Sequence, residues 1–293
     1  MSWMLLSILA ALCWSIVNVA DKFIITKVIK KPIVPVMILG TLGLISSFAI
    51  YFVNGFSRMS FFNVMLAFAA GILYIWAVLL YYDAIKLDEI SRIIPLFYIT
   101  PLFVLIFAGI FLREIFSIAK YIGIFLLVFG AILISARNFQ IRFGKAFWLM
   151  ILASLILAIN SVIQKHLLNA ADFWTVFAYV RIGSFFAVIP VIYFNRKDFS
   201  STMRKKGKKA IALMSFNEFL GLMGILLFTV ATAIGPVTLV NAISSVQPFF
   251  VLLIAVVLSY FFPKILKEEI GKSTLVLKIL AIILMFVGAF LIA

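Results

Sequence analysis

The sequence predicts an all-α membrane protein with ten transmembrane helices, arranged as two inverted-topology five-helix repeats. Of the 293 residues, 66% are hydrophobic and only 12% are charged, whereas a soluble domain carries about 25% charged residues. A helix that spans the hydrocarbon core needs ~20 mostly apolar residues, so ten spans with short links use up the chain. Disordered tails, disulfide scaffolds and a water-exposed catalytic domain are therefore excluded.

Apolar runs bounded by charged residues, proline or glycine define these spans. Because lipid offers no partner to a backbone N–H group, we expect segments of this length to be helices. The longest link, 195–209, is rich in Lys and Arg. In chain order, the predicted spans are residues 3–20, 33–53, 61–82, 90–112, 115–136, 146–168, 172–194, 210–234, 236–262 and 273–292.

Lysine and arginine are divided unequally between the two sides of the predicted membrane. Of the 25 Lys and Arg residues, 20 lie in or beside the links that follow the odd-numbered spans, and five lie elsewhere. The side with more basic links is usually cytoplasmic. The pattern predicts a multi-pass protein of the cell membrane with both termini outside, and it accounts for the net charge of +15 without nucleic acid.

Residue types that carry enzyme or metal chemistry are scarce. The single cysteine, Cys13, cannot form an internal disulfide, and the single histidine, His166, cannot supply a histidine cluster for a metal. The sequence has no glycine-rich phosphate loop followed by Lys-Ser/Thr and no His-Glu-x-x-His motif. We therefore expect no enzyme, no metal site and no cofactor.

The chain contains an internal repeat. The sequence Pro101-Leu-Phe-Val-Leu-Ile in the fourth span recurs 147 residues later as Pro248-Phe-Phe-Val-Leu-Leu-Ile, and the fifth span resembles the tenth. The two units, 1–137 and 144–293, hold five spans each, and because five is odd the second unit enters the membrane from the opposite side. Inverted repeats of this kind are the architecture of secondary transporters, with the substrate site near the midplane between the units.

This doubled pattern resembles the EamA-type drug/metabolite transporters over the whole chain. The resemblance implies a ten-helix carrier with a central cavity among spans one, three, four, six, eight and nine. Several relatives keep both termini in the cytoplasm, unlike the orientation that the charge pattern predicts here. The residues that carry the resemblance are Asn18, Ala84, Pro101, Glu114 and Gly130 in the first unit and Ala231, Pro248, Glu269 and Gly288 in the second.

Arg181 and Glu218 are the two charged residues that lie well within predicted spans. An ionised side chain in the bilayer core costs several kcal/mol (~2.5–3.5 on insertion scales) and usually faces a cavity or a partner. The two residues approach the midplane from opposite sides, at an axial separation on the order of 9 Å. They form either a structural ion pair or part of the substrate path, where Arg181 holds a carboxylate or phosphate and Glu218 titrates.

Two prolines at matching positions of the fourth and ninth spans are expected to kink their helices. A proline removes a backbone hydrogen bond and frees the carbonyl group one turn earlier. Pro101 frees the carbonyl of Phe97, and Pro248 frees that of Ser244. Free backbone groups at membrane depth are tolerated where they meet protein or a watery cavity. Pro101 and Pro248 are therefore candidates for a gating pair.

Further polar residues within the spans are candidates for a binding cavity. Tyrosine has an apolar ring and a polar tip, which suits a cavity but also the membrane interface, where we place Tyr81 and Tyr82 because they lie near a helix end. Polar residues on one face of span nine serve either the cavity or helix packing. Together with Arg181 and Glu218, the candidate binding residues are Asn18, Tyr74, Tyr98, Asn160, Gln164, Asn241, Ser244 and Ser245.

Spans five and ten are poor in polar residues and have small residues at matching positions. Gly123 and Gly130 are seven residues apart, as are Ala281 and Gly288, so each pair lies on one stripe of its helix. Small residues let two helices approach closely. We expect these spans to serve as scaffold between the units or as a dimer contact, without touching substrate.

These patterns predict a secondary transporter that moves a small metabolite, an amino acid or related organic solute, across the cell membrane by alternating access. Its expected partners are the substrate, the lipid bilayer, a coupled proton or ion and a second copy in a homodimer. Two alternatives stay open: a flippase or carrier of lipid-linked or phosphate-bearing amphipathic substrates, and a membrane interaction protein without transport. A lateral opening would favour the flippase, a closed aqueous cavity the metabolite carrier, and a dry interior the interaction protein.

Overall fold

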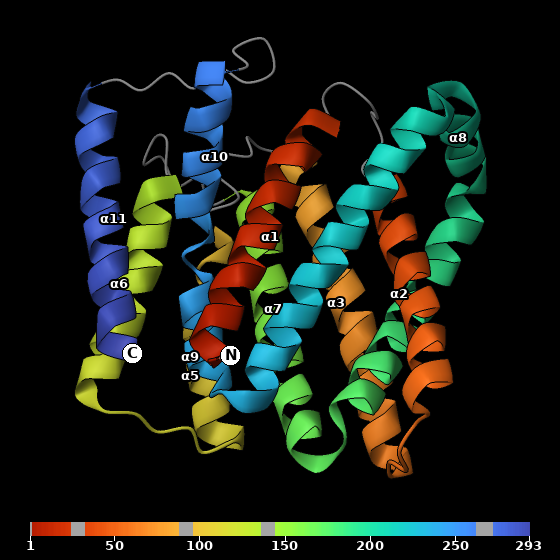
Figure 1. Cartoon of the computed structure of the whole chain (residues 1–293), viewed down its shortest axis with the longest axis horizontal. Helices are drawn as coiled ribbons and strands as arrows, with labels where there is room; N and C mark the ends of the chain where they lie inside the picture. Colours follow the sequence, from red (N-terminus) through yellow and green to blue (C-terminus); the bar gives the residue numbers. More distant parts are fainter. Residues whose placement is uncertain (1, 25–32, 88–95, 136–143, 262–271) are drawn as a thin grey trace.

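In the computed structural model, the described residues form helices joined by short connections, with no β-strand among them (Figure 1). The structure describes residues 2–24, 33–87, 96–135, 144–261 and 272–293. In chain order, its helices are α1 (Trp3–Phe23), α2 (Ile33–Asn54), α3 (Phe61–Leu87), α5 (Thr100–Phe111), α6 (Ile118–Ser135), α7 (Lys145–Ala170), α8 (Phe173–Ile234), α9 (Val237–Ser244), α10 (Gln247–Phe261) and α11 (Lys272–Ile292).

The helices have the length and surface of membrane-spanning segments. Within the described residues, seven segments are long and apolar enough to cross a membrane, and three shorter apolar helices accompany them. Large apolar side chains such as Phe52 and Phe290 are exposed on the outside, an arrangement that water penalises and lipid does not. The prediction of an all-α, multi-pass membrane protein is therefore confirmed.

The long basic link predicted between the seventh and eighth spans is helical. Helix α8 runs from Phe173 to Ile234, and its two arms, Phe173–Arg196 and Ile211–Ile234, are each long enough to cross a membrane. Figure 1 shows the ribbon rising in one arm, turning over and descending in the other. The link contains no proline and several Lys and Arg residues, which favour helix, so helical structure continues through it.

Both prolines that were expected to kink their helices lie beside helix interruptions. Helix α9 ends at Ser244 and α10 begins at Gln247, so the predicted ninth span consists of two helices. Helix α5 begins at Thr100, directly before Pro101. A proline is tolerated in the first turn of a helix, where its missing N–H group would have no partner anyway. Each proline therefore starts a helix instead of bending one.

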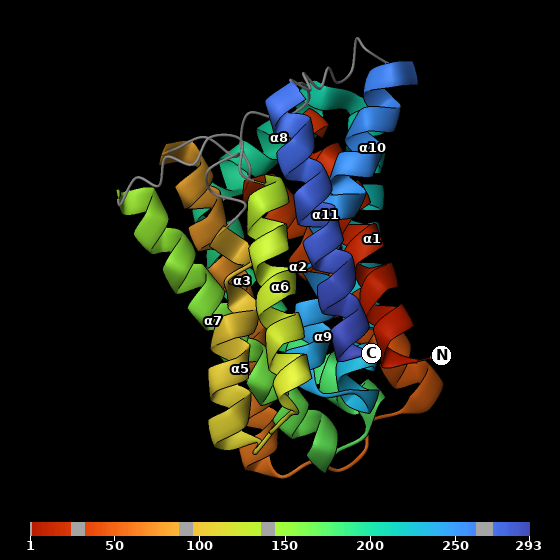
Figure 2. The same ribbon diagram turned by 90° about the vertical axis from the view of Figure 1, so that its left-hand side faces the viewer.

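The two chain ends lie at the same end of the molecule, and the bend of α8 lies at the opposite end (Figures 1 and 2). The connections from α5 to α6, from α7 to α8 and from α8 to α9 lie at the end that holds the termini. We call this end the termini end.

Helices α6 and α11 form a pair at the edge of the molecule and lie side by side in both views (Figures 1 and 2). A Cβ atom added to Gly123 would lie 2.7 Å from the Gly288 carbonyl oxygen, and one added to Gly130 would lie 2.9 Å from the Ala281 carbonyl oxygen. Only glycine permits such an approach. None of these four residues lines the cavity described below. The expected close packing of the two helices through small residues is thus found, and their role as scaffold stays a prediction.

Helix α3 and the first arm of α8 approach each other equally closely. A Cβ atom added to Gly183 would lie 2.5 Å from the Phe68 carbonyl oxygen, and one added to Gly71 would collide with the Val180 carbonyl oxygen. The two glycines therefore let the helix backbones touch. Arg181 lies on α8 directly beside this contact. The contact therefore fixes the position of the Arg181 side chain relative to α3.

Replacing Gly183 with alanine is expected to destabilise the protein by about 1–3 kcal/mol, because the new methyl group must displace backbone atoms of α3. Thermal unfolding in detergent measures the loss. The matched control is Gly109→Ala, whose Cβ atom would meet only the Glu114 carbonyl oxygen at 3.8 Å. Equal unfolding temperatures for the two variants would show that the α3–α8 contact does not limit stability.

Candidate functional site

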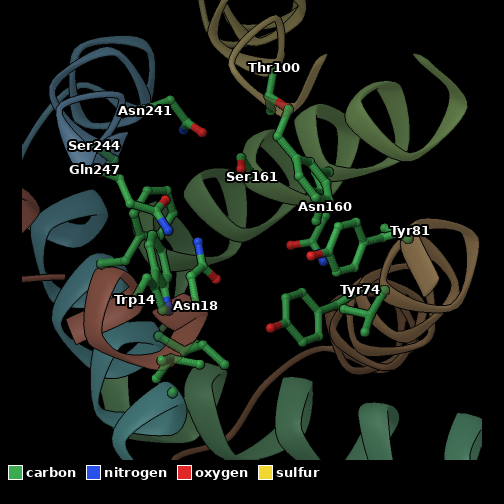
Figure 3. Close-up of a pocket in the computed structure, with 18 of the residues that line it drawn as sticks. Trp14, Asn18, Tyr74, Tyr81, Thr100, Asn160, Ser161, Asn241, Ser244 and Gln247 are labelled. Carbon is green, nitrogen blue, oxygen red and sulfur yellow. The ribbon is translucent and has the colours of Figure 1, made fainter. Parts of the chain in front are cut away.

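A cavity of about 320 Å³ lies between α1, α3, α7, α9 and both arms of α8. Figure 3 shows polar side chains from several helices pointing into this space. All ten candidate binding residues named from the sequence line it, and Pro101 lines it as well, whereas Pro248 does not. The ten are Asn18, Tyr74, Tyr98, Asn160, Gln164, Arg181, Glu218, Asn241, Ser244 and Ser245.

Aromatic side chains from α3 form one wall of the cavity. Tyr74 and Tyr81 face Trp14 of α1 across the open space (Figure 3), and Tyr82 also lines the cavity. The interpretation of Tyr81 and Tyr82 as residues of the membrane interface is therefore wrong. Helix α3 extends to Leu87, beyond the end predicted for this span, and the extra helical turn places both tyrosines inside the bundle.

Arg181 is a buried cation that has no hydrogen bond or ion pair with another described residue. Its side chain is 2% exposed, and its Nε atom has no hydrogen-bond partner. The Cζ atom lies 5.2 Å from the centre of the Tyr74 ring and 5.6 Å from that of Phe177, which is within cation–π distance. Stacking on two rings uses none of the five N–H donors of the guanidinium group, so those that face the cavity can donate to a ligand.

Glu218 and Asp21 place two carboxyl groups on the wall formed by α8 and α1. Asp21 accepts a hydrogen bond of 2.7 Å from the side chain of Asn217. Glu218 is 7% exposed and has no hydrogen bond or ion pair within the described part of the chain. Arg181 and Glu218 thus line the same cavity without contacting each other, so the interpretation as a structural ion pair is wrong.

The amides of the cavity fall into two groups. The Nδ2 atom of Asn160 donates a hydrogen bond of 2.7 Å to the Ala70 carbonyl oxygen, and the side chain of Gln164 donates one to the Oδ1 atom of Asn160. Asn160 therefore joins α7 to α3. Asn18 projects into the cavity (Figure 3) and has no hydrogen-bond partner among the described residues, so its amide can serve a ligand.

Sequence reasoning missed Thr100 and Gln247, which both line the cavity at the helix interruptions. The Oγ1 atom of Thr100 is buried and has no partner. The Gln247 carbonyl oxygen accepts a hydrogen bond of 3.0 Å from the hydroxyl group of Ser15. Each residue directly precedes the proline of its span. A polar residue before such a proline is the signal that could have identified both.

The fold and this cavity define a multi-pass α-helical membrane protein whose interior suits an organic ligand. In the described parts of the chain, no group of three His, Cys, Asp or Glu residues could hold a metal ion. The polar groups that face the cavity are amides, hydroxyl groups, two carboxyl groups and one guanidinium group. Such groups bind an organic solute through hydrogen bonds and charge.

Residues 1–136 match the family model described as the EamA-like transporter family. The predicted resemblance to EamA-type transporters is thereby confirmed over this segment, and the match supports a membrane transporter of small solutes. The fold is similar to that of a crystal structure described only as that of a protein, at a TM-score of 0.77 and 16% identity, covering 99% of this chain and 96% of the other. No curated protein sequence matches the chain.

Asn160→Ala is expected to destabilise the fold by about 1–3 kcal/mol, because it leaves the Ala70 carbonyl oxygen and the Gln164 amide without their partner. Thermal unfolding in detergent gives the difference. Asn18→Ala is the matched control, and we expect it to leave the unfolding temperature unchanged. A larger loss for Asn18→Ala than for Asn160→Ala would overturn the division of the amides into a structural and a ligand-binding group.

Proposed function

We propose that the protein is a secondary transporter that moves a small organic solute bearing a carboxylate or phosphate group, with amino acids as the first candidates, across the cell membrane by alternating access. The observation that carries this proposal is Arg181, a buried cation beside a cavity that is lined in part by polar side chains, with no anionic partner in contact. A buried charge is stable only when paired or hydrogen-bonded. A ligand anion would supply the missing partner.

The arrangement of the helix breaks supports two inverted five-helix units, 1–137 and 144–293. One interrupted helix comes from each unit, α5 from the first and α9–α10 from the second, and both interruptions border the cavity. Seven long and three short apolar segments together allow ten membrane crossings. In inverted-repeat transporters, discontinuous helices of this kind meet at the substrate site near the midplane.

The excess of basic residues in the links opposite the termini end supports an orientation with both termini outside. In that orientation Asp21 lies on the cytoplasmic side of the cavity, since it is near the end of α1 opposite the termini end, and Glu218 lies in the half of its α8 arm that is nearer to that side. The cytoplasmic half of the cavity therefore carries the two carboxyl groups.

The alternatives make different demands on the cavity. A membrane interaction protein without transport needs no polar space in mid-membrane, so the cavity argues against it. A flippase of lipid-linked substrates shares with a solute carrier the need for a cation that holds phosphate, and Arg181 would serve either. The ligand that stabilises the protein separates these two functions.

A thermal-shift screen of the purified protein against amino acids, sugars, nucleotides and lipid phosphates tests the proposal. We expect soluble carboxylates or phosphates to raise the unfolding temperature, and Arg181→Ala to weaken their binding about 10- to 100-fold, because a charge-assisted hydrogen bond is lost. Arg196→Ala is the matched control, since Arg196 is exposed on α8 and stacks on Tyr193.

Three results of this screen would contradict a carrier of anionic solutes. Stabilisation by lipid phosphates alone would favour the flippase. Stabilisation by neutral sugars, to the same extent in Arg181→Ala, would remove Arg181 from the site. Equal loss of binding in Arg181→Ala and Arg196→Ala would show a general effect of charge.

We further propose that the Glu218 carboxyl group carries a coupled proton. Glu218→Gln is then expected to abolish the pH dependence of uptake into proteoliposomes, because an amide cannot gain or lose that proton. Asp21→Asn is the matched control and should keep the pH dependence. An unchanged pH profile in Glu218→Gln would remove this role. The other titratable or charged side chains that line the cavity are Asp21, Tyr74, Tyr81, Tyr82, Tyr98 and Arg181.

A further inference from the structure

Two charged side chains form hydrogen bonds with the backbone of the turn between α8 and α9. One comes from α7 and the other from the connection between α5 and α6. The carboxylate of Glu114, between α5 and α6, accepts hydrogen bonds from the backbone N–H groups of Val237 at 2.8 Å and Thr238 at 3.1 Å. The ammonium group of Lys165, on α7, donates to the carbonyl oxygens of Thr232 and Gly235, each at 2.9 Å. Neither Glu114 nor Lys165 lines the cavity.

Each charge has the sign that its helix end attracts. The first backbone N–H groups of a helix and its last carbonyl groups lack partners within the helix, and the helix dipole favours an anion at the first end and a cation at the last. Glu114 lies at the start of α9, and Lys165 lies at the end of α8. Exchanging the two charges would therefore place both at the wrong helix end.

The α8–α9 turn, which Glu114 and Lys165 contact, lies between the cavity and the termini end. Gln164, the neighbour of Lys165, lines the cavity, and so does Asn241, one helical turn beyond Val237. All eight residues of α9 are buried. The ring of Trp3 packs on the turn so closely that a Cβ atom added to Gly235 would lie 2.6 Å from its Cγ atom. Helix α9 thus forms the floor of the cavity on this side.

One buried group of α9 is left without a partner in this arrangement. The hydroxyl group of Thr238 is 0% exposed and has no hydrogen bond, although a buried polar group normally finds one. This position of α9 is therefore not the best one for its own polar groups. The hydrogen bonds from Glu114 and Lys165 to the backbone of the turn keep α9 in this position, although the Thr238 hydroxyl group is left without a partner.

We propose that Glu114 and Lys165 are positioning residues that hold α9 as the floor of the cavity, and that release of this clamp opens the cavity towards the termini end. In both contacts, a side chain of Glu114 or Lys165 bonds to backbone atoms at a helix end. The turn can therefore break these bonds without unfolding a helix. Only the link from opening to transport rests on the proposed function. The clamp itself is testable without substrate.

The test uses Thr238→Cys as a reporter in a Cys13→Ser background. Thr238 contributes to the clamp only through its backbone N–H group, and its side chain is buried and forms no hydrogen bond that the substitution would remove. In the clamped protein, the new thiol should react slowly with a maleimide. Glu114→Gln or Lys165→Met should raise the labelling rate about tenfold or more, because each removes a charge-assisted hydrogen bond that keeps the floor closed.

Matched variants separate the clamp from general destabilisation. Asp172→Asn alters another carboxylate that caps a helix, since Asp172 accepts from the Thr175 N–H group at the start of α8, and His166→Gln alters the exposed neighbour of Lys165. Both should leave labelling slow, and Lys165→Arg should restore protection. Glu114→Gln keeps the proposal testable if Lys165→Met fails to fold, because it breaks the other half of the clamp.

The outcomes are distinct. Slow labelling in folded Glu114→Gln and Lys165→Met would overturn the clamp, and so would fast labelling in Asp172→Asn. Fast labelling in the two clamp variants alone supports it, even if no solute binds in the thermal-shift screen. In that case the proposed transport function fails, while the clamp stands.

Discussion

The lack of hydrogen-bond partners in lipid is the constraint on which the rest of this structure depends. It requires that the apolar spans be helices, and it restricts free backbone groups to places lined by protein or water. The two interruptions, before α5 and between α9 and α10, accordingly border the cavity. The same constraint is consistent with the place of Asp21, Arg181 and Glu218, which line the cavity.

The molecule divides into a scaffold and a lined interior. The pair of α6 and α11, with glycine against backbone, has an apolar exterior and no residue in the contact that reaches the cavity. The glycine contact of α3 with α8 instead places Arg181 beside Tyr74, within the interior. Close backbone contact thus serves two purposes: rigidity at the edge, and the placement of one cation beside the cavity.

Most of the fold and much of the candidate site could be predicted, and the failures share a physical cause. The apolar runs predicted the helices, but helix ends such as that of α3 could not be placed to within one turn. That turn decided whether Tyr81 and Tyr82 lie at the interface or in the cavity. The helical structure through residues 195–209 was missed because an excess of Lys and Arg predicts on which side of the membrane a link lies, and does not distinguish a helix from a loop. Thr100 and Gln247 were missed because polar residues within a span cannot be assigned to the cavity or to helix packing until the helices are placed.

The sequence by itself determined the membrane character, the repeated prolines and the resemblance to EamA-type transporters, because composition and spacing act locally along the chain. Only the tertiary structure decided which polar groups remain without partners. Asn160 and Asn18 are the same residue type in similar spans, yet the first bonds to the backbone of α3 and the second projects free into the cavity. Arg181 and Glu218 could have paired or not. Pairing depends on where two helices place their side chains in space, which residue spacing along one chain does not specify.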